Sequence, residues 1–159
     1  MDLSSPPDCI EAMLKWSRDM PLHVQPTHTT PHLQSYDSGS IVRIMRERDR
    51  IEHLELFITE EVAIALKSLS HSSIPLPVIH VLIVYNEVAE SAGSMPFPFD
   101  PSLSTSFCTL HVEGFMLERT SRAFHPGTRE LVLSVLDEGD IANEIEDEDA
   151  DQDQGKLLG

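Results

Sequence analysis

The run of residues 78–85 is the feature that most restricts what this chain can fold into. It is β-branched and almost entirely apolar, and His80 interrupts it. Such a run is typical of a central strand that is buried on both faces of its sheet. It is far shorter than the roughly 20 apolar residues that a membrane-spanning helix needs. We therefore expect a sheet with this run near its middle.

Two further segments have the pattern of strands. In residues 105–118, Cys108, Leu110, Val112 and Met116 alternate with Thr109, His111 and Glu113, so one face is apolar and the other is polar. Gly114 interrupts this segment and predicts a bulge or a close backbone approach. Residues 129–136 form the last expected strand. The segments share no visible sequence repeat.

Helix signals are clearest after Thr59, whose hydroxyl can cap a helix that opens with Glu60 and Glu61. A second, N-terminal helix is expected after Pro7, with Asp8 as its capping residue. Residues 40–58 fit either one helical stripe or strands, and we favour strands for their second half.

The order strand, helix, strand, strand, strand predicts an α+β fold. The expected structure is a small, mostly antiparallel sheet with one or two helices packed on it. The predicted core gathers the apolar residues of the expected strands and one helical leucine: Leu66, Val78, Val81, Leu82, Ile83, Val84, Leu110, Val112, Leu131, Leu133 and Val135.

Composition divides the chain into three parts. Residues 1–37 are an N-terminal arm and a linker rich in proline and histidine, and residues 38–136 are expected to form a single globular domain. Residues 137–159 include ten acidic residues within 137–153, where no Lys or Arg occurs. Such a segment cannot bury enough apolar area to offset its ordering entropy, so we predict a disordered acidic tail.

The sequence offers no set of residues for catalysis. It has no Gly-rich phosphate loop and no HExxH, CxxC or GxSxG motif. Cys108 and His111 stand three apart in an expected strand, so they point to opposite faces. His28 and His32 lie between prolines without a nearby third ligand. We therefore predict a protein that is not an enzyme and has no catalytic, cofactor-binding or metal-binding residues.

One basic cluster stands out in a chain whose formal net charge is -16: Arg43, Arg46, Arg48 and Arg50. Its guanidinium groups could bind phosphate or carboxylate in pairs, so these four residues are the candidate partner-binding site. The alternative is an ordinary solvated face. The acidic balance of the chain argues against generic binding to nucleic acid, and no small-molecule substrate is indicated.

The expected location is the cytoplasm or the nucleus. The N-terminus lacks the basic and apolar regions of a signal peptide, and no run is long enough to be a transmembrane segment. The two cysteines give no disulfide framework, which fits a reducing compartment.

Residues 50–138 resemble the matrix proteins of rhabdoviruses. The resemblance rests on four segments in the same order: LELFITEEVAIALKSLSHS, PVIHVLIVYNEVAESA, LHVEGFMLER and PGTRELVLSVLDEGD. The basic N-terminal segment and the PPxY motif that are usual in the family are absent here.

This resemblance implies a non-enzymatic structural protein of the virion that self-associates and links the nucleocapsid to the anionic inner face of the membrane. Its partners would then be itself, the nucleocapsid and the membrane surface of the host cell. The alternative is a cellular adaptor or complex subunit that binds a protein partner through its sheet or helix surface and its acidic tail.

Overall fold

The computed structural model describes residues 1–26, 36–88, 96–115 and 124–135. The helices in these ranges are α1 (Pro7–Ser17), α2 (Ser38–Arg46), the short 3-10 helix η2 (Arg48–Arg50) and α3 (Glu60–Leu69). The strands are β1 (Leu22–Val24), β2 (Ile51–Ile58), β3 (Ile74–Pro75), β4 (Val81–Asn86), β5 (Phe99–Asp100), β6 (Thr109–Phe115) and β7 (Glu130–Val135).

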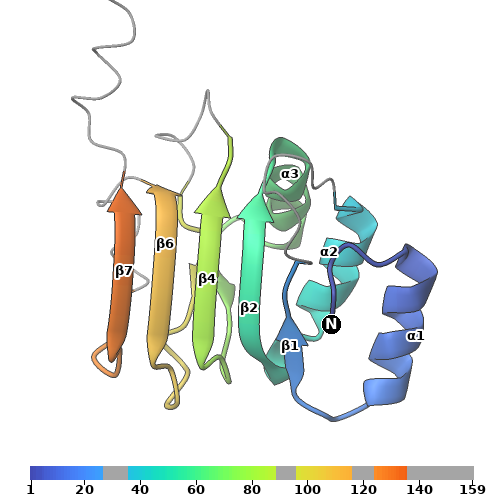
Figure 1. Ribbon diagram of the computed structural model, residues 1–159, viewed down its shortest axis with the longest axis horizontal. Helices are drawn as coiled ribbons and strands as arrows, with labels where there is room; N and C mark the ends of the chain where they lie inside the picture. Colours follow the sequence, from blue (N-terminus) through green and yellow to red (C-terminus); the bar gives the residue numbers. More distant parts are fainter. Residues whose placement is uncertain (27–35, 89–95, 116–123, 136–159) are drawn as a thin grey trace, which may run out of the picture.

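The main sheet is parallel throughout. Its strand order is β1-β2-β4-β6-β7, and each neighbouring pair is parallel, so the labelled arrows in Figure 1 point the same way. The fold is therefore α/β, and the prediction of a mostly antiparallel α+β sheet was wrong. Parallel neighbours need a crossover of about a dozen residues or more. The connections 25–50, 59–80, 87–108 and 116–129 all have that length.

The strands of this sheet follow their order in the chain, so successive units stack on one another. Leu54, Leu82 and Leu110 are equally spaced in the sequence and lie side by side across β2, β4 and β6. Leu131 of β7 extends the same row. This is the arrangement of a solenoid, in which each unit contacts only its neighbours. No repeat is visible in the sequence alone.

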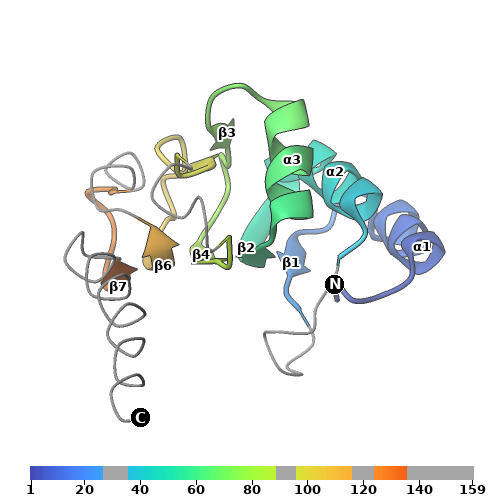
Figure 2. The ribbon, with the colours of Figure 1, turned by 90° about the horizontal axis from the view of Figure 1, so that it is seen from above.

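Helices α2 and α3 lie over one face of the main sheet, and α1 lies beyond its β1 edge. Figure 2 shows α2, α3 and the small sheet of β3 and β5 on the same side. The buried core lies between these layers, where Ile41, Ile44, Val62 and Leu66 of the helices meet the inward residues of the strands. No described helix or strand lies over the opposite face.

This one-sided cover corrects part of the predicted core. Leu82, Val84, Leu110 and Val112 are buried as expected, and so is Leu66. Within β4, however, burial alternates, because Val81, Ile83 and Tyr85 point to the uncovered face and stay partly exposed. The expectation that this strand is buried on both faces was therefore wrong. Leu131 is also 49% exposed, because no described strand follows β7.

Several local predictions were confirmed. The second half of residues 40–58 forms a strand, β2, as we favoured, and the first half, which the sequence left open, forms the helix α2. The Thr59 hydroxyl caps α3 by accepting a hydrogen bond from the Val62 amide at 3.4 Å. Gly114 has a φ of 75° at a shift of register between β6 and β7, which is the bulge that its position indicated.

The first 26 residues contribute to the same core. Helix α1 forms where expected, but Pro6 occupies its N-cap position and no side chain caps it, so Asp8 does not have the predicted role. Strand β1 lies within residues 1–37, where the sequence predicts only an arm and a linker. Residues 1–3 then close the outer edge of β1, where the Leu3 amide donates to the Gln25 carbonyl at 3.0 Å. The acidic segment 137–159 lies outside the described residues.

Candidate functional site

The uncovered face of the sheet is lined by three rows of side chains that run across the strands. The register places corresponding residues of neighbouring strands beside one another. The first row is His23, His53, Val81, Thr109 and Glu130; the second is Glu55, Ile83, His111 and Val132; the third is Phe57, Tyr85, Glu113 and Ser134. This face combines aromatic and aliphatic side chains with carboxylates and imidazoles.

Aromatic rings form a continuous group in the second and third rows. The rings of Phe57 and Tyr85 are stacked, with centroids 4.5 Å apart and planes 15° from parallel. His111 meets Tyr85 edge-on at 5.2 Å. Stacked cross-strand aromatic pairs stabilise a sheet and hold each other in place. We refer to Phe57, Tyr85 and His111 as the aromatic cluster.

Carboxylates flank this cluster. Glu113 is the cross-strand neighbour of Tyr85, and Glu55 lies two residues before Phe57 on β2. The pKa of the Tyr85 hydroxyl is raised, first by burial and then by the negative charges of Glu55 and Glu113. The Nε2 atom of His111 is 3.9 Å from a carboxylate oxygen of Glu113. Among the described strand residues, none of those on this face is a Lys or an Arg.

A pair of histidines occupies the first row. His23 and His53 are stacked with ring centroids 5.9 Å apart, and the Nε2 atom of His53 is buried without a partner among the described residues. The pKa of His53 is lowered, mainly by burial and then by the positive charge of a protonated His23. No group of three or more potential metal ligands occurs in the described part of the chain.

The lowered pKa of His53 predicts a loss of stability in mild acid. As the pH falls through about 6.5, the imidazole at this position takes up a proton in the unfolded chain while it is still neutral in the folded protein. The equilibrium therefore shifts toward unfolding as the pH falls. The melting temperature should therefore fall between pH 7.5 and pH 5.5, and His53→Gln should reduce that fall. The exposed His71 provides the control, since His71→Gln should leave the fall unchanged. If the melting temperature of His53→Gln falls with pH as much as that of the wild type, the role given to His53 is wrong.

The four arginines that the sequence singled out lie on α2 and η2, away from the uncovered face. The Arg43 side chain forms an ion pair with Glu11 at 3.0 Å. Arg46 and Arg48 are exposed, and no ion pair to a described residue occurs at either one. The structure thus does not bring the four guanidinium groups together, and their role in partner binding stays a prediction.

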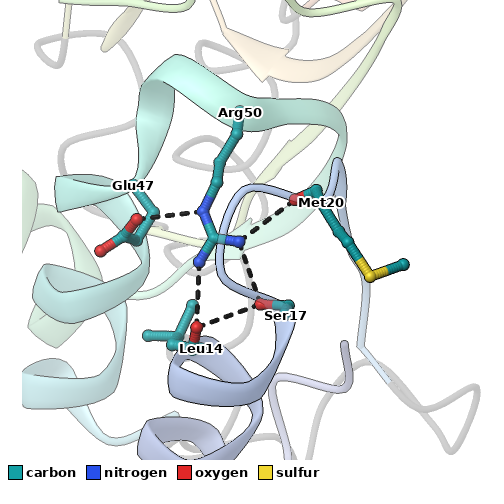
Figure 3. A network of polar contacts seen from close by, with 5 residues as sticks. All are labelled: Leu14, Ser17, Met20, Glu47 and Arg50. Atoms are coloured by element: carbon teal, nitrogen blue, oxygen red, sulfur yellow. Dashed lines mark hydrogen bonds and ion pairs between the residues drawn. The ribbon is translucent and has the colours of Figure 1, made fainter.

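The Arg50 side chain, in contrast to Arg46 and Arg48, forms hydrogen bonds with other described parts of the protein. Its guanidinium group donates to the carbonyls of Leu14 and Met20 at 3.2 and 3.1 Å and to the Ser17 hydroxyl at 3.0 Å (Figure 3). Its Nε atom also contacts the Glu47 carboxylate at 3.0 Å. Leu14 and Ser17 belong to the last turn of α1, where carbonyl groups lack helical partners and a cation is favourable. Arg50 therefore fastens the end of α1 to the rest of the protein.

We expect Arg50→Met to lower the free energy of unfolding by about 2–4 kcal/mol, because it leaves several partly buried acceptors without their charged donor. The amides of α1 should also exchange faster with solvent. Arg48→Met removes an exposed arginine and is the matched control. Urea denaturation and hydrogen exchange test this, and equal protection of α1 in both variants would contradict the role given to Arg50.

An open groove of about 720 Å³ lies between the outer surfaces of α2 and α3. Arg43, Arg46, Glu61 and Ile64 are among its lining residues. Two of the predicted partner-binding arginines thus share this groove with an isoleucine that is 62% exposed. The groove and the uncovered sheet face are on opposite sides of the helical layer, so they are separate surfaces.

Sequence reasoning missed the uncovered face as a surface, although its pattern is present. The motif of two apolar residues separated by one outward residue occurs at Leu54–Leu56, Leu82–Val84, Leu110–Val112 and Leu131–Leu133. Its recurrence could have indicated stacked parallel strands. The residues between and beside these pairs are the ones that line the face.

Comparisons of the chain with protein-family models, with curated proteins and with solved structures gave no match. They therefore neither support nor oppose the resemblance to rhabdovirus matrix proteins, which stays a hypothesis. In the part of the chain that the structure describes, no helix has both the length and the apolar character needed to cross a membrane.

Proposed function

We propose that this protein is a non-catalytic binding module, an adaptor or a subunit of a complex, that engages a protein partner through the uncovered face of its sheet. The observation that carries the proposal is that the described helices and strands cover only one face of a parallel sheet. Parallel sheets occur almost only with both faces covered, because their strands are apolar on both sides. Here Val81, Ile83 and Tyr85 remain partly exposed on the uncovered face.

The strand order supports a binding role over a nucleotide-dependent activity. Open α/β sheets that bind nucleotides do so in the crevice where the strand order reverses. The order β1-β2-β4-β6-β7 does not reverse anywhere, so these strands form no such crevice. They form a continuous surface instead, and stacked units of this kind bind partners over an extended face.

A matched pair of substitutions tests the proposal. Ile83→Lys places a charge on the uncovered face, and Ile64→Lys places the same charge on the outer surface of α3. The full chain and both variants are used to capture partners from an extract of the source cells, after melting curves have shown that the variants fold. We expect a protein that the wild type and Ile64→Lys retain and that Ile83→Lys loses by about tenfold. Capture that survives Ile83→Lys but not Ile64→Lys would contradict the proposal.

Self-association, which the matrix resemblance implies, is a second candidate, and the free edge of β7 favours it. Among the described residues no strand pairs with this edge, and Leu131 and Val132 are 49% and 42% exposed beside it. Unpaired strand edges recruit further strands. The opposite edge is closed by residues 1–3, so two copies would join through β7 alone. A concentration-dependent dimer in sedimentation that Val132→Lys abolishes would support this candidate, and a monomer at all concentrations would exclude it.

A further inference from the structure

The geometry points to a recognition site for an arginine or lysine side chain on the uncovered face, formed by the Phe57 and Tyr85 rings and the carboxylates of Glu55 and Glu113. The occupant would be a basic segment of a partner protein. This inference rests on the proposed function, since it specifies the chemistry of the partner that the face would bind.

The first argument is the combination of groups. Arginine and lysine have an apolar stem and a cationic head, and the stem can lie along aromatic rings while the head reaches a carboxylate. The stacked Phe57–Tyr85 pair offers the rings, and Glu113, the cross-strand neighbour of Tyr85, offers a carboxylate whose side chain is 52% exposed. Glu55 lies in the row next to that pair.

The second argument is that the carboxylates of Glu55 and Glu113 are both neighbours of Tyr85. Glu113 is the cross-strand neighbour of Tyr85, and Glu55 is its diagonal neighbour across β2 and β4. The pKa of the Tyr85 hydroxyl is raised first by burial and then by the negative charges of these two residues. A cation placed over Tyr85 would therefore meet two carboxylates that no described Lys or Arg neutralises.

The third argument is charge complementarity at long range. The described strand residues of this face include three glutamates, Glu55, Glu113 and Glu130, and no Lys or Arg. The whole chain has a formal net charge of -16, and ten acidic residues follow β7 within 137–153. A field of one sign raises the rate of encounter with ligands of the opposite sign. It would repel an acidic partner from this face.

The test uses the full chain and an acetylated, amidated tetra-arginine peptide as the probe, with tetra-glutamate as its control. Nuclear magnetic resonance signals of the Phe57 and Tyr85 rings report binding at the site separately from binding at residues 137–153. We expect tetra-arginine to shift both ring signals in a saturable way. Glu55→Gln combined with Glu113→Gln should weaken this site-resolved affinity by about tenfold, which corresponds to about 1.4 kcal/mol.

The matched control is Glu60→Gln combined with Glu61→Gln, which removes the same charge from the exposed start of α3 and should change the affinity less than about twofold. Tyr85→Leu, which keeps an apolar side chain but removes the ring, should also weaken binding. Unmoved rings with shifts only in residues 137–153, or equal losses in the two double variants, would overturn the inference. If Ile83→Lys still abolishes partner capture in that case, the binding face stands and only its preference for a cation fails.

Discussion

Leu110→Ala is expected to lower the free energy of unfolding by about 2–5 kcal/mol, which is a large part of the stability of a small domain. Leu110 is fully buried in β6, between Leu82 of β4 and Leu131 of β7. Its truncation leaves a cavity on the covered face of the sheet that the surrounding strands cannot close without losing their register. The cost therefore combines lost apolar burial with an unfilled volume.

Ile83→Ala is the informative comparison, because Ile83 is the neighbour of the buried Leu82 but points to the uncovered face. Its truncation should cost less than about 1.5 kcal/mol, since its side chain is partly exposed and opens no enclosed cavity. Urea denaturation of the two variants and the wild type measures both values. Equal losses would mean that the face is covered and would remove the physical basis of the proposed function.

Gly114→Ala is expected to cost about 2–4 kcal/mol, through backbone strain together with a steric clash against the neighbouring strand. Gly114 has a φ of 75°, in the left-handed region that alanine enters only at a cost of about 1–2 kcal/mol. A β-carbon at this position would also lie 2.6 Å from the carbonyl oxygen of Asn86. That oxygen belongs to the end of β4, so relief would require a shift between two strands of the sheet.

The change would also disturb a specific contact, since the Asn86 side-chain amide donates to the Gly114 carbonyl at 2.8 Å. Gly39→Ala is the control. Gly39 lies in the first turn of α2 at a backbone conformation that alanine adopts readily, and its added β-carbon would meet only an oxygen of the Asp37 carboxylate, at 3.2 Å. Thermal melting should show a small effect for Gly39→Ala and a large one for Gly114→Ala. A neutral Gly114→Ala would show that the bulge is not fixed by the sequence.

Local features of the fold could be predicted because local physics determines them. Thr59 caps α3 through a hydrogen bond to an amide three residues away, and the alternation of Leu110 and Val112 with His111 follows from the pleat of a strand. These signals need only neighbouring residues. The same is true of Gly114, since a glycine within an alternating strand usually marks a bulge or a close backbone approach.

Strand direction could not be predicted in this way, because an apolar run has the same composition whichever way its neighbour points. The lengths of the connections contained the missing information, since each of them is long enough for a crossover between parallel strands. Strand β1 was missed because three residues, Leu22 to Val24, give too short a pattern. Its position depends on contacts with β2 and with residues 1–3, which are remote in sequence.

The residues of the candidate site also divide into those that local sequence predicts and those that only the fold brings together. The basic cluster could be recognised because its charges are close in sequence. In the structure, however, Arg50 binds the end of α1 and Arg43 forms an ion pair with Glu11. The aromatic cluster was missed because Phe57, Tyr85 and His111 lie on three separate strands. Only the parallel register places them together. Surfaces made by stacked strands therefore cannot be recognised from single segments of the sequence.

The most direct test of the central claim is a carbene footprint of the protein, alone and bound to the partner that the capture experiment retains. In the free protein Tyr85 and Ile83 should be labelled, together with Trp16 and Ile64 on the helices, which are 80% and 62% exposed. Binding should protect Tyr85 and Ile83 and leave Trp16 and Ile64 as reactive as before. Protection of Trp16 or Ile64 with unchanged labelling of Tyr85 and Ile83 would contradict the account.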